Sequence, residues 1–408
     1  MDQVVIVGAS LAGFRAAEEL RFQGFAGAIH LVGDEPHRPY DRPPLSKHVL
    51  AGKQPPEATE LSAAMGSIDD LDLTWHLGVP ATGLDLAARV VLLGGGERLP
   101  FDGLVIATGA TPRHLPGTDH LAGVHSLRTL DDCLAIRAAL DGAPRRVVVV
   151  GAGFIGAEVA ATCRGLGIEV TLVEALPVPL ERGVGPVLGQ VVADLHRDHG
   201  VDVHLGVGVL RIVGDDSDQV TQVHLTDGAE LDADLVVVGV GVTPNTEWLE
   251  GSGLTLDNGV LCDETCLAAP GVVAAGDVAR WHNRRFGEQM RVEHWDNAVD
   301  MGGHAARTLL ANAAGGTGEP YEPIPWFWSD QYDRKIQLAG RASADDDVAV
   351  VAGSLEERKF IVFFGRGGRL VGVLGMSMPA KVMRWRTLLE AGASWDEALA
   401  AAAPAVEA

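Results

Sequence analysis

The sequence repeats one pattern, in which an apolar strand, a glycine turn, a helix and a second strand are followed by an acid. The first copy comprises a strand at 4–7, the turn Gly8-Ala9-Ser10-Leu11-Ala12-Gly13, a helix over 14–22, a strand at 28–32, and Asp34 with Glu35. The second comprises a strand at 146–150, the turn Gly151-Ala152-Gly153-Phe154-Ile155-Gly156, a helix to about Leu166, a strand at 169–173, and Glu174. This is the order of a βαβ dinucleotide-binding unit. The repeat therefore predicts an α/β protein with two Rossmann-like domains.

The glycines of each turn suit the binding of a pyrophosphate. One lets the chain reverse tightly, another lets the backbone approach the phosphates, and the third lets helix and strand pack closely. Unpaired N–H groups and the dipole at the helix N-terminus then face the negative charge. The second turn fits this pattern in full, whereas Ser10 replaces the middle glycine of the first. For either motif alone, a tight turn without a ligand is the alternative.

Glu174 indicates which nucleotide the second unit binds. It lies about twenty residues beyond its glycines, where a carboxylate can accept hydrogen bonds from a ribose diol. The same carboxylate would repel the 2′-phosphate of NADPH, and no Arg or Lys immediately follows it. The sequence therefore predicts NADH, with an ordinary strand-end acid as the alternative.

Later segments complete each half and add a third part. A strand at 103–106 leads into Ala107-Thr108-Gly109, a strand at 235–238 leads into Gly239-Val240-Gly241, and a strand at 272–275 leads into Gly276-Asp277. The glycine-rich run at 313–318 is typical of a connector. Beyond it, strands at 335–338, 348–351, 360–364 and 370–374 precede helices, which predicts a C-terminal α+β domain.

Composition excludes several classes of protein. The formal net charge of -23 over 408 residues disfavours binding to nucleic acid or to anionic membranes. No apolar run reaches the ~18 residues of a membrane-spanning helix, and the apolar residues 4–7 indicate a buried strand rather than a signal peptide. Fourteen histidines are scattered without ligand spacing, so no metal site is expected. Four cysteines form no disulfide framework, and a reducing cytoplasm is the simple inference.

Four motifs resemble one known family. They are Asp41-Arg42-Pro43-Pro44-Leu45-Ser46-Lys47, Ala107-Thr108-Gly109, Gly276-Asp277 and Pro325-Trp326-Phe327-Trp328-Ser329-Asp330-Gln331. Together they resemble the FAD-dependent, NADH-using ferredoxin reductases that serve bacterial cytochrome P450 and Rieske oxygenase systems. The resemblance implies an FAD-binding domain at 1–112 and 243–318, an NAD-binding domain at 113–242, and a C-terminal α+β domain at 319–408. It also implies a [2Fe–2S] ferredoxin as the partner.

The resemblance assigns most cofactor-binding residues. Asp277 would hold the ribityl chain or pyrophosphate of FAD through the helix start that follows it, and Asp34 and Glu35 would lie at the adenosine ribose. The remaining FAD positions are Ser10, Leu11, Ala12, Gly13, Arg42, Val79, Ala107, Thr108, Gly109, Arg128, Gly276 and Trp295. The NADH positions are Gly151, Gly153, Phe154, Ile155, Gly156, Glu158, Glu174, Arg182, Val240 and Gly241.

Lys47 and Glu158 are the candidate catalytic residues. In relatives the lysine lies beside the flavin N5 edge and pairs with an acid from the NAD motif, here Glu158. A cation there would stabilise negative charge on the reduced flavin, and its carboxylate partner would offset the cost of desolvation. The alternatives are an exposed lysine after a Pro-Pro turn and a polar helix residue. Neither residue is needed as a general acid or base, because hydride transfer depends mainly on alignment.

The positions of the cysteines distinguish between the classes of enzyme that share this scaffold. Disulfide reductases need a Cys pair near the flavin, and peroxidases of this type need one reactive Cys there, but the stretch around Lys47 has none. The pair Cys262 and Cys266 is better interpreted as packing or surface residues than as a redox pair. Reduced FAD must then pass its electrons outside the chain. Trp326-Phe327-Trp328 would shield the flavin or lie on the exit path, or else form a core strand.

Two other functions fit the same motifs. One is the reduction of a quinone or another small acceptor, and the other is a non-enzymatic redox-signalling flavoprotein. The acidic charge also opposes an acidic ferredoxin, so docking would need a local basic patch. Candidates are Arg280, Arg284, Arg285 and Arg291, together with Lys381, Arg384 and Arg386, with scattered solubilising charge as the alternative.

Overall fold

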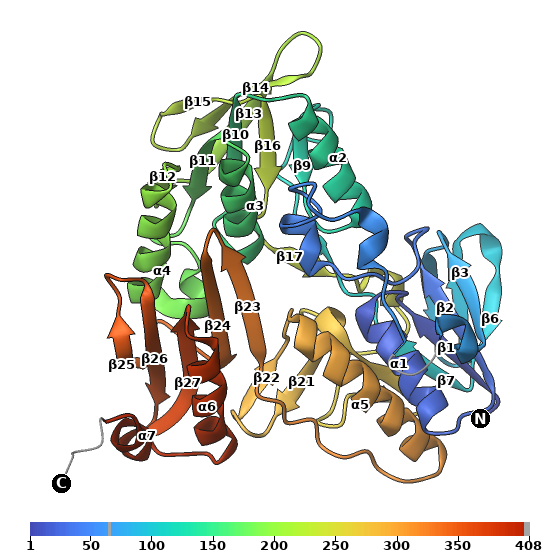
Figure 1. The fold of residues 1–408 in the computed structure, drawn as a ribbon. Coiled ribbons are helices and arrows are strands. Elements are labelled where there is room, and N and C mark those ends of the chain that lie inside the picture. The colour runs from blue at the N-terminus through green and yellow to red at the C-terminus, as the bar shows by residue number, and fades with distance from the viewer. Residues whose placement is uncertain (64–66, 404–408) are drawn as a thin grey trace. The chain divides into compact units, whose positions relative to one another are not determined.

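The computed structural model describes residues 1–63 and 67–403, apart from the side chain of Arg182 (Figure 1). The chain forms two compact units. The first consists of Met1–Asp41, Glu57–Thr111 and Val242–Pro325, and the second of Arg42–Pro56, Pro112–Gly241 and Trp326–Ala408. The predicted α/β class with two Rossmann-like sheets and a C-terminal antiparallel sheet is confirmed. None of the described helices is long and apolar enough to cross a membrane.

The first unit is built on a six-stranded sheet in the order β19-β20-β7-β1-β2-β3. Strands β1, β2, β3, β7 and β20 run parallel, and β1 lies between β2 and β7. Val4, Val5 and Ile6 of β1 are completely buried, as expected for a parallel sheet covered on both faces. Its strands are β1 (Gln3–Val7), β2 (Ala28–Gly33), β3 (Leu73–Leu77), β7 (Gly103–Ile106), β19 (Leu267–Ala269) and β20 (Val272–Ala274).

Helix α1 (Leu11–Phe22) packs against α5 (Trp295–Ala313). Three small ladders complete the unit, namely β4 (Ala81–Asp85) with β5 (Val90–Leu93) and β6 (Arg98–Pro100), β8 (Ala110–Pro112) with β17 (Val242–Pro244), and β18 (Val260–Leu261) with β21 (Ala279–Asn283) and β22 (Glu288–Met290). The helix expected after Asp277 is absent from the described chain at this place. Gly276–Val278 is one 3₁₀ turn that runs directly into β21, and the next helix is α5. That detail of the prediction is wrong.

The second unit contains a five-stranded parallel sheet in the order β12-β11-β10-β16-β9. Its strands are β9 (Val124–Ser126), β10 (Arg146–Val150), β11 (Glu169–Glu174), β12 (Asp202–Leu205) and β16 (Leu235–Val238). Helices α2 (Leu130–Asp141), α3 (Phe154–Gly165) and α4 (Glu181–Asp198) connect them, and β13 (Val209–Gly214), β14 (Val220–Leu225) and β15 (Glu230–Asp232) form a meander. The unit also holds the 3₁₀ turn at Pro43–Ser46.

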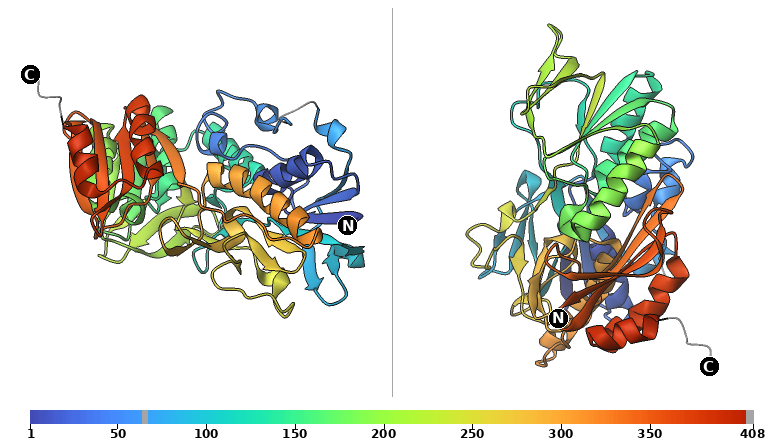
Figure 2. Two further views of the ribbon diagram at one scale, coloured as in Figure 1. Left: turned by 90° about the horizontal axis from the view of Figure 1, so that it is seen from below. Right: turned by 90° about the vertical axis from the view of Figure 1, so that its left-hand side faces the viewer.

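The C-terminal sheet of this unit is antiparallel, in the order β23-β24-β27-β26-β25. Its strands are β23 (Trp326–Gln331), β24 (Arg334–Gly340), β25 (Asp347–Ser354), β26 (Lys359–Arg366) and β27 (Arg369–Met376), followed by α6 (Pro379–Glu390) and α7 (Trp395–Ala402). Figure 2 shows α6 and α7 beside this sheet. Leu180, the residue before α4, and Leu188 of α4 share one hydrophobic cluster with Phe327 and Phe364 of the sheet. The C-terminal sheet and the second Rossmann-like sheet therefore belong to one packed body.

Candidate functional site

In the first unit, the predicted FAD residues lie at the carboxyl ends of neighbouring parallel strands. Gly8 follows β1, Ala107 follows β7, and the turn at Gly276 follows β20. Hydrogen bonds connect these ends, since Ala107 donates to the Val7 carbonyl at 2.7 Å and Ala275 donates to the Ile106 carbonyl at 2.9 Å. Ligands of open α/β sheets bind at this edge, where the strand order reverses.

Close approach of backbone segments explains the glycines at this edge. A Cβ on Gly8 would lie 2.0 Å from the Ala107 carbonyl oxygen, and one on Gly13 would lie 2.0 Å from the Gly8 carbonyl oxygen. A Cβ on Gly276 would lie 3.0 Å from that of Ala12. Strand, helix and the Gly276 turn can therefore come together only with glycine at these positions.

The start of α1 has no capping side chain. Ser10 is its N-cap residue and makes no side-chain capping bond, and the first turn contains no acid. By contrast, α2 and α7 begin with capping boxes in which a hydroxyl and a carboxylate satisfy the helix ends. The uncapped N–H groups of α1 fit the pyrophosphate of a dinucleotide.

The other predicted residues of this unit make the following contacts. Asp34 and Glu35 follow β2, and the Glu35 carboxylate accepts a hydrogen bond from the Tyr40 hydroxyl. Val79 donates its N–H to the Gly33 carbonyl at 2.9 Å. Trp295 begins α5 and donates its indole N–H to Asp41 Oδ1 at 2.7 Å. Thr108 donates its hydroxyl to the carbonyl of Asn245 at 2.8 Å, and Asn245 was not among the predicted site residues.

The second unit repeats this arrangement around Gly151. That residue has φ +96°, and a Cβ on it would lie 2.3 Å from the Gly239 carbonyl oxygen, while a Cβ on Gly156 would lie 1.9 Å from the Gly151 carbonyl oxygen. Gly153 is different, because nothing lies within 4 Å of the Cβ that it would carry. Two glycines therefore serve packing, and the middle one faces open space at the uncapped start of α3. This is the fit expected for a second pyrophosphate.

Glu174 ends β11 beside this turn. Its carboxylate accepts from the Ala152 N–H at 2.6 Å and from the Leu176 N–H at 2.8 Å. These two bonds fix the carboxylate at the glycine turn and leave further acceptor positions on both oxygens. Glu174 is therefore fixed beside the glycine turn of the second unit, and its ribose contact stays a prediction.

The structure places most of the remaining predicted residues of the second unit. Val240 and Gly241 follow β16 at the same sheet edge as Gly151. Ile155, in the first turn of α3, is 45% exposed. Arg42 donates to the carbonyl of Arg128, two residues beyond β9, at 2.6 Å. Arg182 belongs to α4, but its side chain lies outside the described part of the structure.

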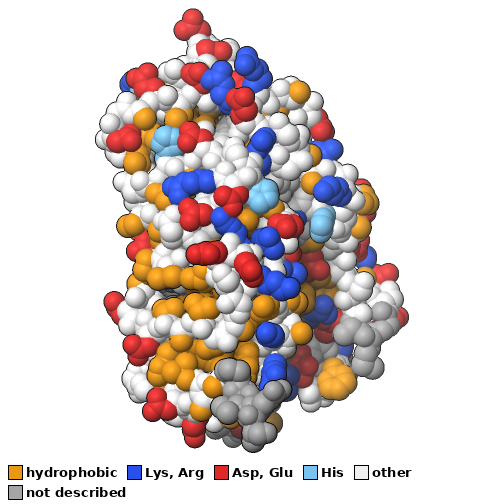
Figure 3. Space-filling model, turned by 60° about the vertical axis from the view of Figure 1, so that its left-hand side comes forward, with side chains coloured by type: hydrophobic (Ala, Val, Ile, Leu, Met, Phe, Trp, Pro, Cys, Tyr) orange, Lys and Arg blue, Asp and Glu red, His pale blue; other side chains and the backbone are white. Residues whose placement is uncertain are grey.

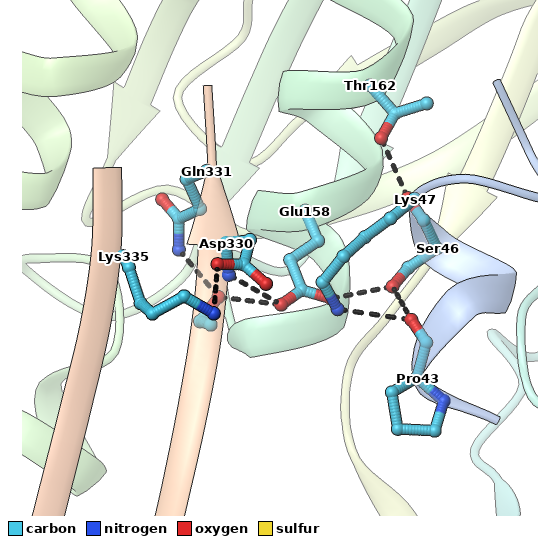
Figure 4. A network of polar contacts seen from close by, with 9 residues as sticks. Pro43, Ser46, Lys47, Glu158, Thr162, Asp330, Gln331 and Lys335 are labelled. Atoms are coloured by element: carbon cyan, nitrogen blue, oxygen red, sulfur yellow. Dashed lines mark hydrogen bonds and ion pairs between the residues drawn. The ribbon is translucent and has the colours of Figure 1, made fainter. Parts of the chain in front are cut away.

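Glu158 is the centre of a buried polar network in the second unit (Figure 4). Its side chain is only 3% exposed, and its Oε2 accepts from Lys47 Nζ and from Ser46 Oγ, both at 2.6 Å. Its Oε1 accepts from Ser329 Oγ at 2.8 Å and from the Asp330 N–H at 3.3 Å. Four donors fill the acceptor capacity of the carboxylate, so its negative charge is fully compensated despite burial. The ion pair expected between Lys47 and Glu158 is present.

The helical period explains how one helix reaches both partners. Phe154, Glu158 and Thr162 are four residues apart on α3 and so lie along one stripe of the helix. The Phe154 ring packs on Phe327 of β23 with centroids 4.3 Å apart, and Thr162 donates to the Ser46 carbonyl at 2.7 Å. Glu158, in the middle of the stripe, contacts both the Pro43–Ser46 turn and β23. Lys47 donates also to the Pro43 carbonyl at 3.1 Å, and its side chain is 13% exposed.

The aromatic segment 326–328 belongs to strand β23. Its side chains alternate, with Phe327, Ser329 and Gln331 buried and the two tryptophans on the opposite face partly exposed. The rings of Trp326 and Trp328 are 5.1 Å apart and tilted. Ser46 and Ser329 belong to separate sequence motifs, and their link to Glu158 is seen only in the fold.

All four cysteines are buried and unpaired. Burial raises the pKa of Cys133 to about 11 and the pKa values of Cys163 and Cys262 to about 12, and it also raises the pKa of Cys266 well above its usual value. Cys262 and Cys266 both lie in the hydrophobic core of the first unit, in agreement with their interpretation as packing residues. None of the four is a thiolate nucleophile at neutral pH.

Comparison with known proteins accounts for this architecture. The sequence model described as pyridine nucleotide-disulphide oxidoreductase matches residues 2–302, and the one described as reductase C-terminal matches 326–407. This chain belongs to the pyridine nucleotide-disulphide oxidoreductase family. The redox disulfide of the family name has no counterpart among its four buried thiols.

Relatives within this oxidoreductase family match nearly the whole chain. Rhodocoxin reductase of Rhodococcus erythropolis is 40% identical over 95% of this chain and 89% of its own length. The ferredoxin–NAD(+) reductase component of the p-cumate 2,3-dioxygenase system of Pseudomonas putida is 37% identical, over 94% and 93%. The reductase in the crystal structure of the covalent putidaredoxin reductase–putidaredoxin complex superposes with a TM-score of 0.88 at 36% identity, covering 95% of this chain and 93% of that one. These relatives place the chain in the ferredoxin-reductase branch of the family.

Proposed function

We propose that this protein is an NADH:ferredoxin oxidoreductase that supplies electrons to a cytochrome P450 or Rieske oxygenase through a [2Fe–2S] ferredoxin. The observation that carries the proposal is the combination of two dinucleotide-binding units with four buried, protonated thiols. The chain has no disulfide of its own to accept electrons, because all four cysteines are unpaired, so a bound flavin must pass its electrons to a partner. The names of the relatives, which include reductases of P450 and dioxygenase systems, support the same conclusion.

Each cofactor has its own set of residues. We assign FAD to a domain formed by 1–112 and 243–318, NADH to 113–242, and a supporting role to 319–408. The cradles around Gly8 and Gly151, each at an uncapped helix N-terminus, support the two nucleotide assignments. Glu174 supports NADH over NADPH, because a fixed carboxylate at the ribose would repel a 2′-phosphate.

FAD supplies the chemistry, since it accepts an electron pair as hydride and returns electrons singly. Oxidation of one NADH to NAD⁺ thus reduces two ferredoxins and releases one proton. The protein orients the reactants and holds charge. Lys47 presents a cation whose position is fixed by Glu158 and the Pro43 carbonyl, and this cation stabilises the negative charge that hydride transfer brings. Glu158 lies one turn inside the helix that begins at the NADH turn, so nucleotide and cation are positioned by the same element.

Anaerobic stopped-flow spectroscopy tests the proposed function. The flavoprotein is mixed with NADH, and the reduced protein is then mixed with a panel of [2Fe–2S] ferredoxins, with a quinone and with oxygen. We expect rapid bleaching of the flavin by NADH, slow reoxidation by oxygen, and fast reoxidation by one ferredoxin. Fast reoxidation by the quinone alone would instead identify the small-acceptor reductase, and slow turnover with a long-lived NAD⁺ complex would identify the signalling flavoprotein.

The surface charges narrow the search for the ferredoxin-docking face. Arg280, Arg284 and Arg291 form ion pairs with Asp257, Glu264 and Glu293. Figure 3 shows how basic and acidic side chains lie next to each other over much of one face. On α6, Lys381 and Arg384 are exposed and form no ion pair with any described residue, whereas Arg386 pairs with Glu390 at 3.3 Å. We therefore propose that α6 carries the charges that attract an acidic ferredoxin.

Charge reversal on α6 tests this docking site. The double variant Lys381→Glu/Arg384→Glu is expected to raise the KM for ferredoxin about tenfold at low ionic strength, with little effect at high salt, because screening removes long-range attraction. Flavin reduction by NADH should not change. The matched control Arg284→Glu/Arg285→Glu should have a smaller effect, because Glu264 already offsets Arg284. Equal effects of the two pairs, or a KM independent of salt, would contradict the assignment.

We also propose a reducing, cytoplasmic location. The four unpaired cysteines support it, because an oxidising compartment favours disulfides.

A further inference from the structure

The C-terminal sheet supplies half of the hydrogen bonds that hold the Glu158 carboxylate. Oε2 accepts its hydrogen bonds from the Pro43–Lys47 segment. Oε1 accepts one from Ser329 at 2.8 Å and a weaker one from the Asp330 N–H at 3.3 Å, both from β23 (Figure 4). Ser329 is completely buried, so no solvent molecule can take the place of its hydroxyl without rearrangement. The orientation of the carboxylate that faces Lys47 therefore depends on a strand that lies 171 residues further along the chain.

The neighbour of Ser329 fixes the direction of its hydroxyl proton. Gln331, also completely buried, donates its side-chain amide to Ser329 Oγ at 3.2 Å. A serine hydroxyl has one hydrogen, and because Gln331 occupies an acceptor position of the oxygen, that hydrogen is available to Glu158. Asp330, between them, points to the other face of the strand and pairs with Lys335 at 2.8 Å. The alternation of β23 thus aims Ser329 and Gln331 inward as one donor chain that ends at Glu158.

We propose that Ser329 is a positioning residue for hydride transfer, acting through Glu158 on Lys47. This inference rests on the proposed function, because it assigns Lys47 to the flavin. Without the hydroxyl, Oε1 keeps only the longer bond from Asp330, and the carboxylate turns towards its remaining donors on the Pro43–Lys47 segment. The ammonium, held by Glu158 Oε2 and the Pro43 carbonyl, moves with it. A shift of a fraction of an ångström in a charge beside the reacting atoms slows the reaction without preventing NADH from binding.

Rapid flavin reduction by NADH, measured anaerobically without ferredoxin, tests the proposal. Ser329→Ala is expected to lower the limiting rate at saturating NADH about tenfold, the loss typical of one hydrogen bond to a charged group, and to change the apparent affinity for NADH less than about twofold. Ser329→Thr, which keeps the hydroxyl, should recover most of the rate. Ser377→Ala is the matched control, because the buried Ser377 hydroxyl has no hydrogen-bond partner among the described residues of the same domain. Its rate should equal that of the wild type.

A double mutant shows whether Ser329 acts through Glu158. In a Glu158→Gln background, Ser329→Ala should change the rate less than about twofold, since the group that it positions is already lost. A full tenfold loss in that background, a wild-type rate for Ser329→Ala, or a Ser329→Thr variant as slow as Ser329→Ala would each overturn the inference. A wild-type rate for Glu158→Gln would instead refute the proposed role of Glu158 itself. Failure of every ferredoxin as acceptor would refute the proposed function without affecting these rates, which are measured with NADH alone.

Discussion

Lys47→Met is expected to slow flavin reduction by NADH about a hundredfold or more at saturating NADH. Methionine keeps the length and apolar character of the side chain but removes the cation proposed to stabilise the charge that arrives with the hydride. The loss should appear in the limiting rate rather than in the affinity for NADH. The Lys47 ammonium contacts Glu158, which Ser46 also contacts, and the substitution alters no part of the glycine turn. Stopped-flow bleaching of the flavin over a range of NADH concentrations separates the two quantities.

The same variant should also lose stability, because it leaves a buried carboxylate without its cation. Removing one partner of a buried ion pair typically costs about 3–5 kcal/mol in the free energy of unfolding, whereas replacing both partners costs much less. We therefore expect the double variant Lys47→Met/Glu158→Gln to recover most of the stability that Lys47→Met loses. The double variant should recover none of the lost rate of flavin reduction. Lys335→Met is the matched control, since Lys335 pairs with Asp330 on the same network but is 43% exposed. A rate for Lys47→Met within threefold of the wild-type rate would contradict the assigned role of Lys47.

Local chemistry explains what the sequence could predict. A glycine turn, its flanking strands and the acid after the second strand are all encoded within about thirty residues, so both nucleotide units could be located from residue spacing alone. Glu174 is an example, because its position at the end of β11 follows directly from the strand pattern. The strands of the C-terminal sheet were equally visible, because each is an apolar run bounded by polar or glycine residues.

Contacts between distant segments could not be predicted in this way. Ser46 and Glu158 are 112 residues apart, and nothing in the spacing of either residue indicates that the two hydroxyls of Ser46 and Ser329 converge on one carboxylate. The partners of the arginine cluster were hidden for the same reason. Asp257 lies 23 residues before its partner Arg280 and Glu264 lies 20 residues before its partner Arg284, and the fold alone brings each pair together.

At the turn that contains Asp277, the motif led to the prediction of a helix that the structure does not have. A Gly-Asp pair after a buried strand resembles a helix start, yet Gly276 has φ +73° and the chain forms only one 3₁₀ turn before β21. Gly276 also lies close to α1, since a Cβ on it would be 3.0 Å from that of Ala12. The glycine allows this backbone conformation and close approach, and no helix begins there.

Gly153→Val is expected to abolish flavin reduction at NADH concentrations that saturate the wild type, while leaving the fold intact. Gly153 has φ -68° and ψ -179°, which valine adopts without strain, and nothing within 4 Å would meet its Cβ. The branched side chain would fill the open space at the uncapped start of α3, where the pyrophosphate must approach the backbone. The apparent dissociation constant for NADH should rise about a hundredfold or more, and the melting temperature should change little.

Two comparisons make this result specific to nucleotide binding. Gly165→Val, on the same helix and also with open space around its Cβ, should leave the affinity for NADH unchanged, because Gly165 lies at the opposite end of α3. Gly156→Ala should destabilise the protein as well as weaken binding, because its Cβ would lie 1.9 Å from the Gly151 carbonyl oxygen. Equal losses of NADH affinity in Gly153→Val and Gly165→Val would mean that the helix, and not its N-terminal turn, determines binding. A normal affinity in Gly153→Val would place the pyrophosphate away from Gly153, and with it the assignment of the second nucleotide site would fail.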